Sequence, residues 1–126
     1  MRICALILMI AIPRGSLAEP LSTEFVVCSA YSKAMSKLFE NNGRNESALL
    51  ALTRANSLLK IAEALDAMER IPKQVSIELQ DLTYRSLMAG VATSNDELRL
   101  ISEYEKQCAE IGSRARKVIP LLQSPP

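Results

Sequence analysis

The chain has 126 residues, of which 48% are hydrophobic and 4% aromatic, and it contains neither tryptophan nor histidine. This length is that of one domain rather than two. A formal net charge of +1 gives no basic excess of the kind that nonspecific nucleic-acid binding requires. The lack of histidine excludes histidine-dependent catalytic triads and an imidazole-based charge switch near neutral pH.

Residues 1–18 have the three parts of a secretory signal peptide. A positive charge at Arg2 is followed by an unbroken apolar run, Ile3–Ile12, and small residues lie three and one positions before a cleavage point between Ala18 and Glu19. This run is too short for a helix that spans a bilayer, which needs about 20 residues. We predict a leader that is cleaved, with an uncleaved N-terminal anchor as the alternative.

Cleavage would remove Arg2 and Arg14 but no acidic residue, so the net charge of residues 19–126 becomes −1. A chain this close to neutrality argues against nucleic acid as the main partner. The sequence also has no long basic amphipathic segment of the membrane-surface kind, so we expect no stable membrane insertion after cleavage. We predict an exported protein and favour the bacterial periplasm over the extracellular medium.

The mature part is rich in residues of high helix propensity, and we predict four helices at about 22–40, 46–70, 73–92 and 95–119. Asn41-Asn42-Gly43 supplies the left-handed residue that ends the first helix, and Pro72 forces the break after the second. Ser94 and Glu97 form a capping box for the fourth. Short connections predict one all-α domain over 19–126, an antiparallel up-down-up-down four-helix bundle.

The second predicted helix is the longest and most apolar. Its expected buried stripe follows helical spacing and consists of Leu49, Leu52, Ala55, Leu59, Ala62 and Leu65, broadened by Leu50, Leu58 and Ile61. So broad a stripe fits either a homodimer face or a central buried helix. Asn45 is expected as the N-cap, and Asn45-Glu46-Ser47 is a glycosylation acceptor only in a eukaryotic host.

Cysteine usage predicts one structural disulfide. Cys4 lies in the leader, so Cys28 and Cys108 remain as an even pair in an oxidising compartment. Both lie on apolar stripes, formed in the first helix by Cys28, Tyr31, Met35 and Leu38 and in the last by Ile101, Tyr104, Cys108, Ile111, Ala115 and Val118. Two buried free thiols and a redox pair are the alternatives, and the absence of C-x-x-C spacing argues against the redox pair.

The sequence shows no catalytic, cofactor or metal-binding constellation, and we predict no cofactor. Two widely spaced cysteines without histidine do not fit a zinc or haem site. Ser57 and Lys60 match S-x-x-K, but the companion motifs S-D-N and K-T-G are missing, so both are interpreted as ordinary helix residues. The one local basic cluster, Arg114, Arg116 and Lys117, is interpreted either as a partner or anion contact or as cations that favour a helix C-terminus.

These features predict a small exported, non-catalytic protein of the cell envelope that binds a protein partner, as an accessory, immunity or inhibitor protein. The plan of leader, four helices and one bridge is typical of several kinds of small bacterial periplasmic protein, and a fold alone does not decide function. The main alternative is an acid- or stress-responsive periplasmic chaperone that opens when its 14 carboxylates are protonated. A carrier of small apolar ligands and an enzyme are two further alternatives.

Overall fold

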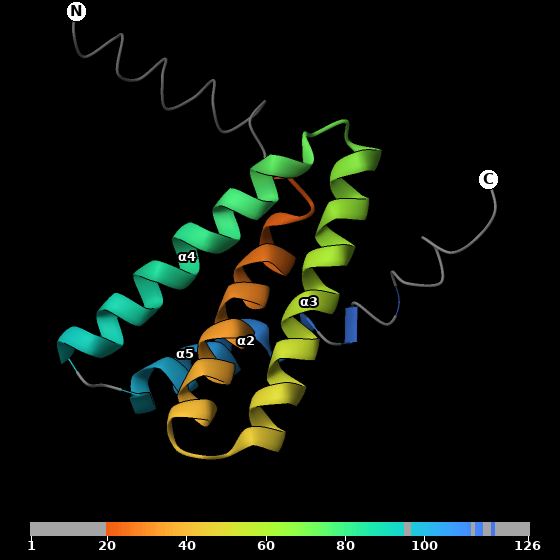
Figure 1. Ribbon diagram of the computed structural model, residues 1–126. Helices are drawn as coiled ribbons and strands as arrows, with labels where there is room; N and C mark the ends of the chain where they lie inside the picture. Colours follow the sequence, from red (N-terminus) through yellow and green to blue (C-terminus); the bar gives the residue numbers. More distant parts are fainter. Residues whose placement is uncertain (1–19, 95–96, 112, 115–116, 118–126) are drawn as a thin grey trace, which may run out of the picture.

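The computed structural model describes residues 20–94, 97–111, 113–114 and 117, and that part of the chain is helical without strands. Its four helices are α2 (Thr23–Asn41), α3 (Asn45–Met68), α4 (Lys73–Ser94) and α5 (Glu97–Cys108) (Figure 1). The all-α class and the presence of four helices are therefore confirmed. The predicted signal peptide, residues 1–18, lies outside the described residues. The same holds for residues 95–96, 112, 115–116 and 118–119 of the predicted fourth helix.

Two similar turns end α2 and α3. Gly43 adopts a left-handed φ of 74° and donates its N–H to Glu40, while the next N–H, of Arg44, reaches back to Phe39. At the end of α3 the left-handed residue is Arg70, with a φ of 60°. Its N–H bonds to the carbonyl of Ala67 and the following N–H, of Ile71, to that of Asp66. Both turns are Schellman motifs, in which a left-handed residue lets the last carbonyls of a helix find donors.

The predicted caps of α3 and α5 have different outcomes. Asn45 is the first residue of α3 rather than its N-cap, a position that Arg44 occupies without a side-chain cap bond. The prediction for Asn45 was wrong because the turn after α2 leads directly into α3. The expected capping box of Ser94 and Glu97 spans residues 95–96, which lie outside the described residues.

Small side chains bring α2 and α3 together as an antiparallel pair. Ser22, Ser29 and Ser36 repeat every seven residues along α2 and its N-cap, as do Ala48, Ala55 and Ala62 along α3, and all six are buried. We call this contact the Ser–Ala seam. A seven-residue repeat keeps such residues on one face of a helix. Across the seam the hydroxyls of Ser36 and Ser29 donate to the carbonyls of Ala48 and Ala55, at 2.7 and 2.5 Å.

The seam sets which face of α3 is buried. Ala55, Leu58, Ile61, Ala62 and Leu65 face the core, as expected. Three leucines predicted to be buried, Leu49, Leu50 and Leu52, are instead 66%, 73% and 40% exposed. The prediction was wrong for these leucines because the close approach of α2 requires small residues, so the alanine face of α3 turns inward and the leucines beside it turn out.

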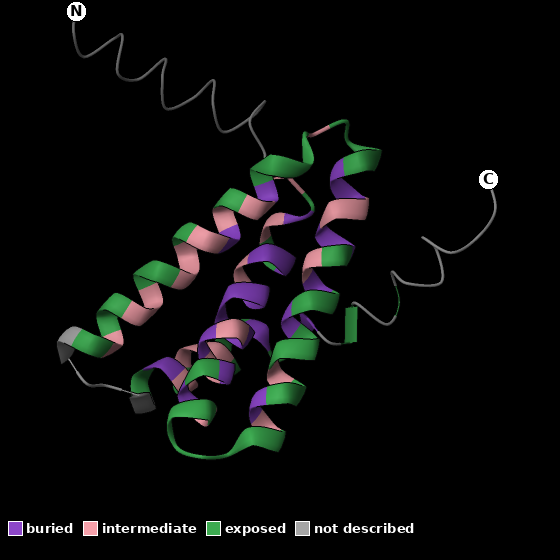
Figure 2. Cartoon of the chain, in the orientation of Figure 1, coloured by how far each residue is buried: buried purple, intermediate pink, exposed green. Residues whose placement is uncertain are grey.

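The other long helix, α4, lies beside α2 on the side away from α3 (Figure 1). Its only fully buried side chains in the described part are Ser76 and Gln80, and the Gln80 amide donates to the hydroxyl of Ser29 at 2.8 Å. Figure 2 shows the contrast, since α2 is mostly buried whereas α4 alternates between half-buried and exposed residues. The helix α4 therefore covers one side of α2 without being enclosed itself.

The short helix α5 lies against α2 around the two cysteines. The Sγ atoms of Cys28 and Cys108 are 2.08 Å apart and their Cα atoms 5.7 Å, so the predicted pair is at disulfide distance. The two helices run in opposite directions, because Tyr104 of α5 meets Ser32 of α2, whereas Cys108, later in α5, meets Cys28, earlier in α2. No described helix is long and apolar enough to cross a membrane.

Candidate functional site

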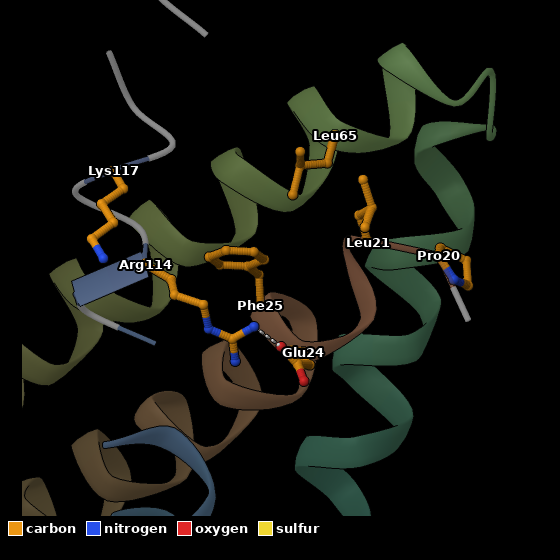
Figure 3. Close-up of a pocket in the computed structure, with 7 residues that line it drawn as sticks. All are labelled: Pro20, Leu21, Glu24, Phe25, Leu65, Arg114 and Lys117. Carbon is orange, nitrogen blue, oxygen red and sulfur yellow. Dashed lines mark ion pairs between the residues drawn. The ribbon is translucent and has the colours of Figure 1, made fainter. Parts of the chain in front are cut away.

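A pocket of about 570 Å³ opens where the start of α2, the last part of α3 and the segment after α5 meet. It is lined by Pro20, Leu21, Glu24, Phe25, Leu65, Arg114 and Lys117 (Figure 3). Ligand pockets have volumes of about 300–1,000 Å³, so its size is that of a small-molecule site. These residues come from three distant parts of the sequence.

The floor of the pocket is apolar. Phe25 of α2 and Leu65 of α3 are 5% and 7% exposed, and Figure 3 shows them between the cationic side chains and the segment of Pro20 and Leu21. Leu21 is 64% exposed, so its side chain forms an open apolar edge. Its backbone N–H donates to the carboxylate of Glu69 at 2.9 Å, which fastens this segment to the end of α3.

The opposite edge of the pocket carries charge. The Arg114 guanidinium pairs with the Glu24 carboxylate at 2.5 Å, and both side chains are about half exposed. Lys117 lies three residues further on, is exposed, and makes no ion pair with any residue that the structure describes. Two of the three residues of the predicted basic cluster thus line the pocket, while Arg116 lies outside the described residues.

The carboxylate of Asp66, next to Leu65 in the chain, joins the last part of α3 to the starts of α2 and α4. It is 1% exposed and accepts hydrogen bonds from the hydroxyls of Ser22, at the start of α2, and Ser76, in the first turns of α4. These bonds satisfy a buried charged group, which would otherwise be costly. Leu65 and Leu21 each neighbour a member of this cluster in the chain, so the cluster helps to position the pocket wall.

In the middle of α5, hydrogen bonds of two tyrosines bridge α2 and α5. The Tyr31 hydroxyl donates to Glu103 at 3.1 Å, and the Tyr104 hydroxyl lies 3.2 Å from Ser32 and accepts from Arg54 at 3.1 Å. Burial raises the pKa of Tyr31, as do its hydrogen bond to Glu103 and the charge of that carboxylate, while Arg99 acts in the opposite direction. This cluster is an anchor for α5 rather than part of the pocket.

The pocket offers an apolar floor and two cations, which is a chemistry suited to binding. Glu24 is the one carboxylate among its seven lining residues and is already paired with Arg114. Ser57 and Lys60 lie exposed on α3. No group of three potential metal-ligating side chains occurs in the described ranges.

Sequence reasoning found the cations but missed the rest of the pocket. Phe25 and Leu65 were recognisable only as core residues, because each meets the basic cluster through tertiary packing. The hydrogen-bonded cluster of Asp66, Ser22 and Ser76 had one sequence signal, which is that the acidic Asp66 lies one turn after Ala62 on the buried face of α3. No protein-family model matches the chain, and no curated protein or solved structure matches it. Function is therefore inferred from residues and geometry alone.

Proposed function

We propose that this chain is a small exported, non-catalytic protein of the cell envelope, located in the bacterial periplasm, that binds a protein partner. In this proposal residues 1–18 are a cleaved leader, and residues 19–126 form one four-helix bundle stapled by Cys28 and Cys108. The sulfur atoms at bonding distance support an oxidising compartment, because such bonds persist there. Cross-linking fixes the helices in place and so gives a partner a preformed surface.

The observation that carries the proposal is a group of exposed leucines at the start of α3, namely Leu49, Leu50 and Leu52, here called the α3 leucine patch. Their exposed fractions are 66%, 73% and 40%. Covering a fully exposed leucine contributes about 1.5–3 kcal/mol. Neighbouring exposed apolar side chains are typical of interaction sites. The patch gives a protein partner an apolar anchor on a rigid helix.

The test is affinity capture of the tagged mature protein from its native envelope fraction, followed by mass spectrometry. We expect one near-stoichiometric protein with the wild-type chain and its loss with the double variant Leu49→Asp, Leu50→Asp. The matched control is Leu82→Asp on α4, because Leu82 is 63% exposed and lies outside the patch. Equal capture by the wild type and the double variant would contradict the role of the patch.

A second copy of the chain is the other protein that the patch would fit. Sedimentation of the purified mature protein separates this case from a different partner. A dimer that the double variant converts to monomer would identify the patch as a homodimer face. A wild-type monomer leaves a heterologous partner as the proposal.

An acid-activated chaperone would use the same exposed leucines but would bind unfolded clients only at low pH. Circular dichroism and hydrophobic-dye fluorescence between neutral pH and about pH 2 distinguish this function. Increased dye binding with retained helicity would favour it. Unchanged signals across that range would rule it out and leave the dedicated binding protein.

A further inference from the structure

We propose that the pocket between Phe25, Leu65 and Lys117 binds an aliphatic monocarboxylate, a molecule with one carboxylate on an unbranched apolar chain. This second binding activity goes beyond the protein-binding function and uses a different surface, since the α3 leucine patch contributes no residue to the pocket. The two proposals can therefore fail separately.

The apolar half of the ligand is specified by the floor. Phe25 and Leu65 are fixed in the core, at 5% and 7% exposure, and they still border a space of about 570 Å³. Leu21 continues this surface to the open edge at 64% exposure. An alkyl chain that lies across these three side chains would remove apolar surface of both partners from water, which is the main source of affinity for such a ligand.

The anionic half is specified by the opposite edge. Two cations and one carboxylate lie there, so the edge has an excess positive charge. Glu24 engages Arg114 at 2.5 Å, which leaves the ammonium of Lys117 as the cation without an ion pair among the described residues. A carboxylate next to Lys117 would form a charge-assisted hydrogen bond and would also interact favourably with Arg114.

The two halves have a defined order in space. Figure 3 shows Arg114 and Lys117 on one side of Phe25, and Leu21 with Pro20 on the other. The ligand is therefore oriented with its carboxylate near the segment after α5 and its chain directed towards the start of α2.

An extended peptide fits the same pocket less well. Its amide groups would lie over Phe25 and Leu65, where the lining offers no polar partner, and buried amides without partners are costly. Both cations of the lining stand on one side of Phe25, away from Leu21. An unbranched alkyl chain has no such requirement, which is why we favour the monocarboxylate over a segment of a protein.

The proposal is tested by titration calorimetry on the full mature chain with octanoate, decanoate and dodecanoate, each below its micelle concentration. Affinity should rise about fourfold for each added methylene until the floor is covered. The alcohol of equal chain length should bind at least about tenfold more weakly, because it lacks the charge-assisted bond. Equal affinity for alcohol and carboxylate would overturn the role of the cations, and no binding by any of the three would overturn the site.

Variants then place the ligand. Lys117→Glu should weaken decanoate binding at least about tenfold, whereas Lys60→Glu, an exposed lysine of α3, should leave it unchanged. Leu21→Ser should weaken it about fivefold, and the control Leu82→Ser, at 63% exposure against 64% for Leu21, should not. All four positions are exposed, so the variants should fold. Unchanged decanoate affinity in Lys117→Glu and Leu21→Ser would show that the carboxylate binds elsewhere and would overturn the proposal.

Discussion

The helices α3 and α5 both pack on α2, but they are attached in different ways. The contact of α3 follows the Ser–Ala seam along most of both helices and is made of close packing and hydroxyl bonds. The helix α5 has 12 residues, and its described contacts with α2 centre on the Cys28–Cys108 pair and on Tyr31 and Tyr104.

This difference shows where a covalent bond contributes most. A long helix that buries a full face is stabilised by the sum of many weak contacts. A short helix that buries few side chains gains little from packing, and a cross-link that limits the unfolded chain can supply the missing stability. Four variants test how far the two attachments differ.

Loss of the cross-link should have the largest effect. The cysteines are 80 residues apart, and the chain-entropy model gives about 4–5 kcal/mol for a loop of this size. We expect Cys28→Ala with Cys108→Ala to lower the free energy of unfolding by about this amount, as measured by urea denaturation. Hydrogen exchange should show amides of α5 losing protection before those of α2 and α3.

Reduced wild-type protein is the control for this double variant, because it lacks the bond but keeps both side chains. It should be destabilised to a similar extent. If the reduced protein and the double variant were as stable as the oxidised chain, packing alone would hold α5.

The second effect concerns the buried carboxylate at the end of the seam. Asp66→Ala removes the acceptor for the hydroxyls of Ser22 and Ser76, two residues that are only 3% and 2% exposed. Two buried donors would lose their partner, which should cost about 2–4 kcal/mol in urea denaturation. The same substitution at Asp81, which pairs with Arg85 on the surface, should cost less than about 1 kcal/mol. Similar losses at the two positions would show that the buried cluster contributes no special stability.

The third effect tests how closely the seam is packed. Ala55 is 1% exposed and faces Ser29, so Ala55→Leu would force the two helices apart. Overpacking of this kind costs about 1–3 kcal/mol. Ala67→Leu, at an exposed position of the same helix, is the control and should leave the thermal midpoint nearly unchanged. If Ala55→Leu left the thermal midpoint unchanged, the seam would have room for larger side chains.

The seam also explains how far the sequence alone could predict the fold. Helix positions were predictable because Gly43 and Pro72 act locally on the backbone. The pairing of the two cysteines was predictable because the predicted leader includes Cys4 and so leaves one even pair. The buried face of α3 was predicted only in part, since leucines dominate any hydrophobic pattern whereas close helix packing selects alanines such as Ala55.

The candidate site was less predictable than the fold. Arg114 and Lys117 could be predicted as part of a basic cluster because they lie close together in the sequence. Their meeting with Phe25 and Leu65 depends on where α5 and the segment after it lie, and no local pattern specifies that position.

The smallest effect concerns the hydrogen bond between Tyr31 and Glu103, which attaches α5 to α2 in addition to the Cys28–Cys108 cross-link. Tyr31→Phe removes the hydroxyl that donates to Glu103 and should cost about 0.5–1.5 kcal/mol near neutral pH. Because burial and Glu103 raise the folded-state pKa of Tyr31, its hydroxyl contributes this stability fully below about pH 10, the pKa of unfolded tyrosine. As pH rises through the higher folded-state pKa, the contribution is lost.

The stability difference between wild type and Tyr31→Phe should therefore be constant up to about pH 10 and shrink above it, measured by urea denaturation at successive pH values. Tyr84→Phe is the control, because it keeps the ring that Lys33 Nζ approaches to 4.5 Å. A difference that grows above pH 10 would reverse the assigned sign. No difference at any pH would mean that packing of the ring, and not its hydroxyl, holds this part of α5, so the cross-link would be the main specific attachment of that helix.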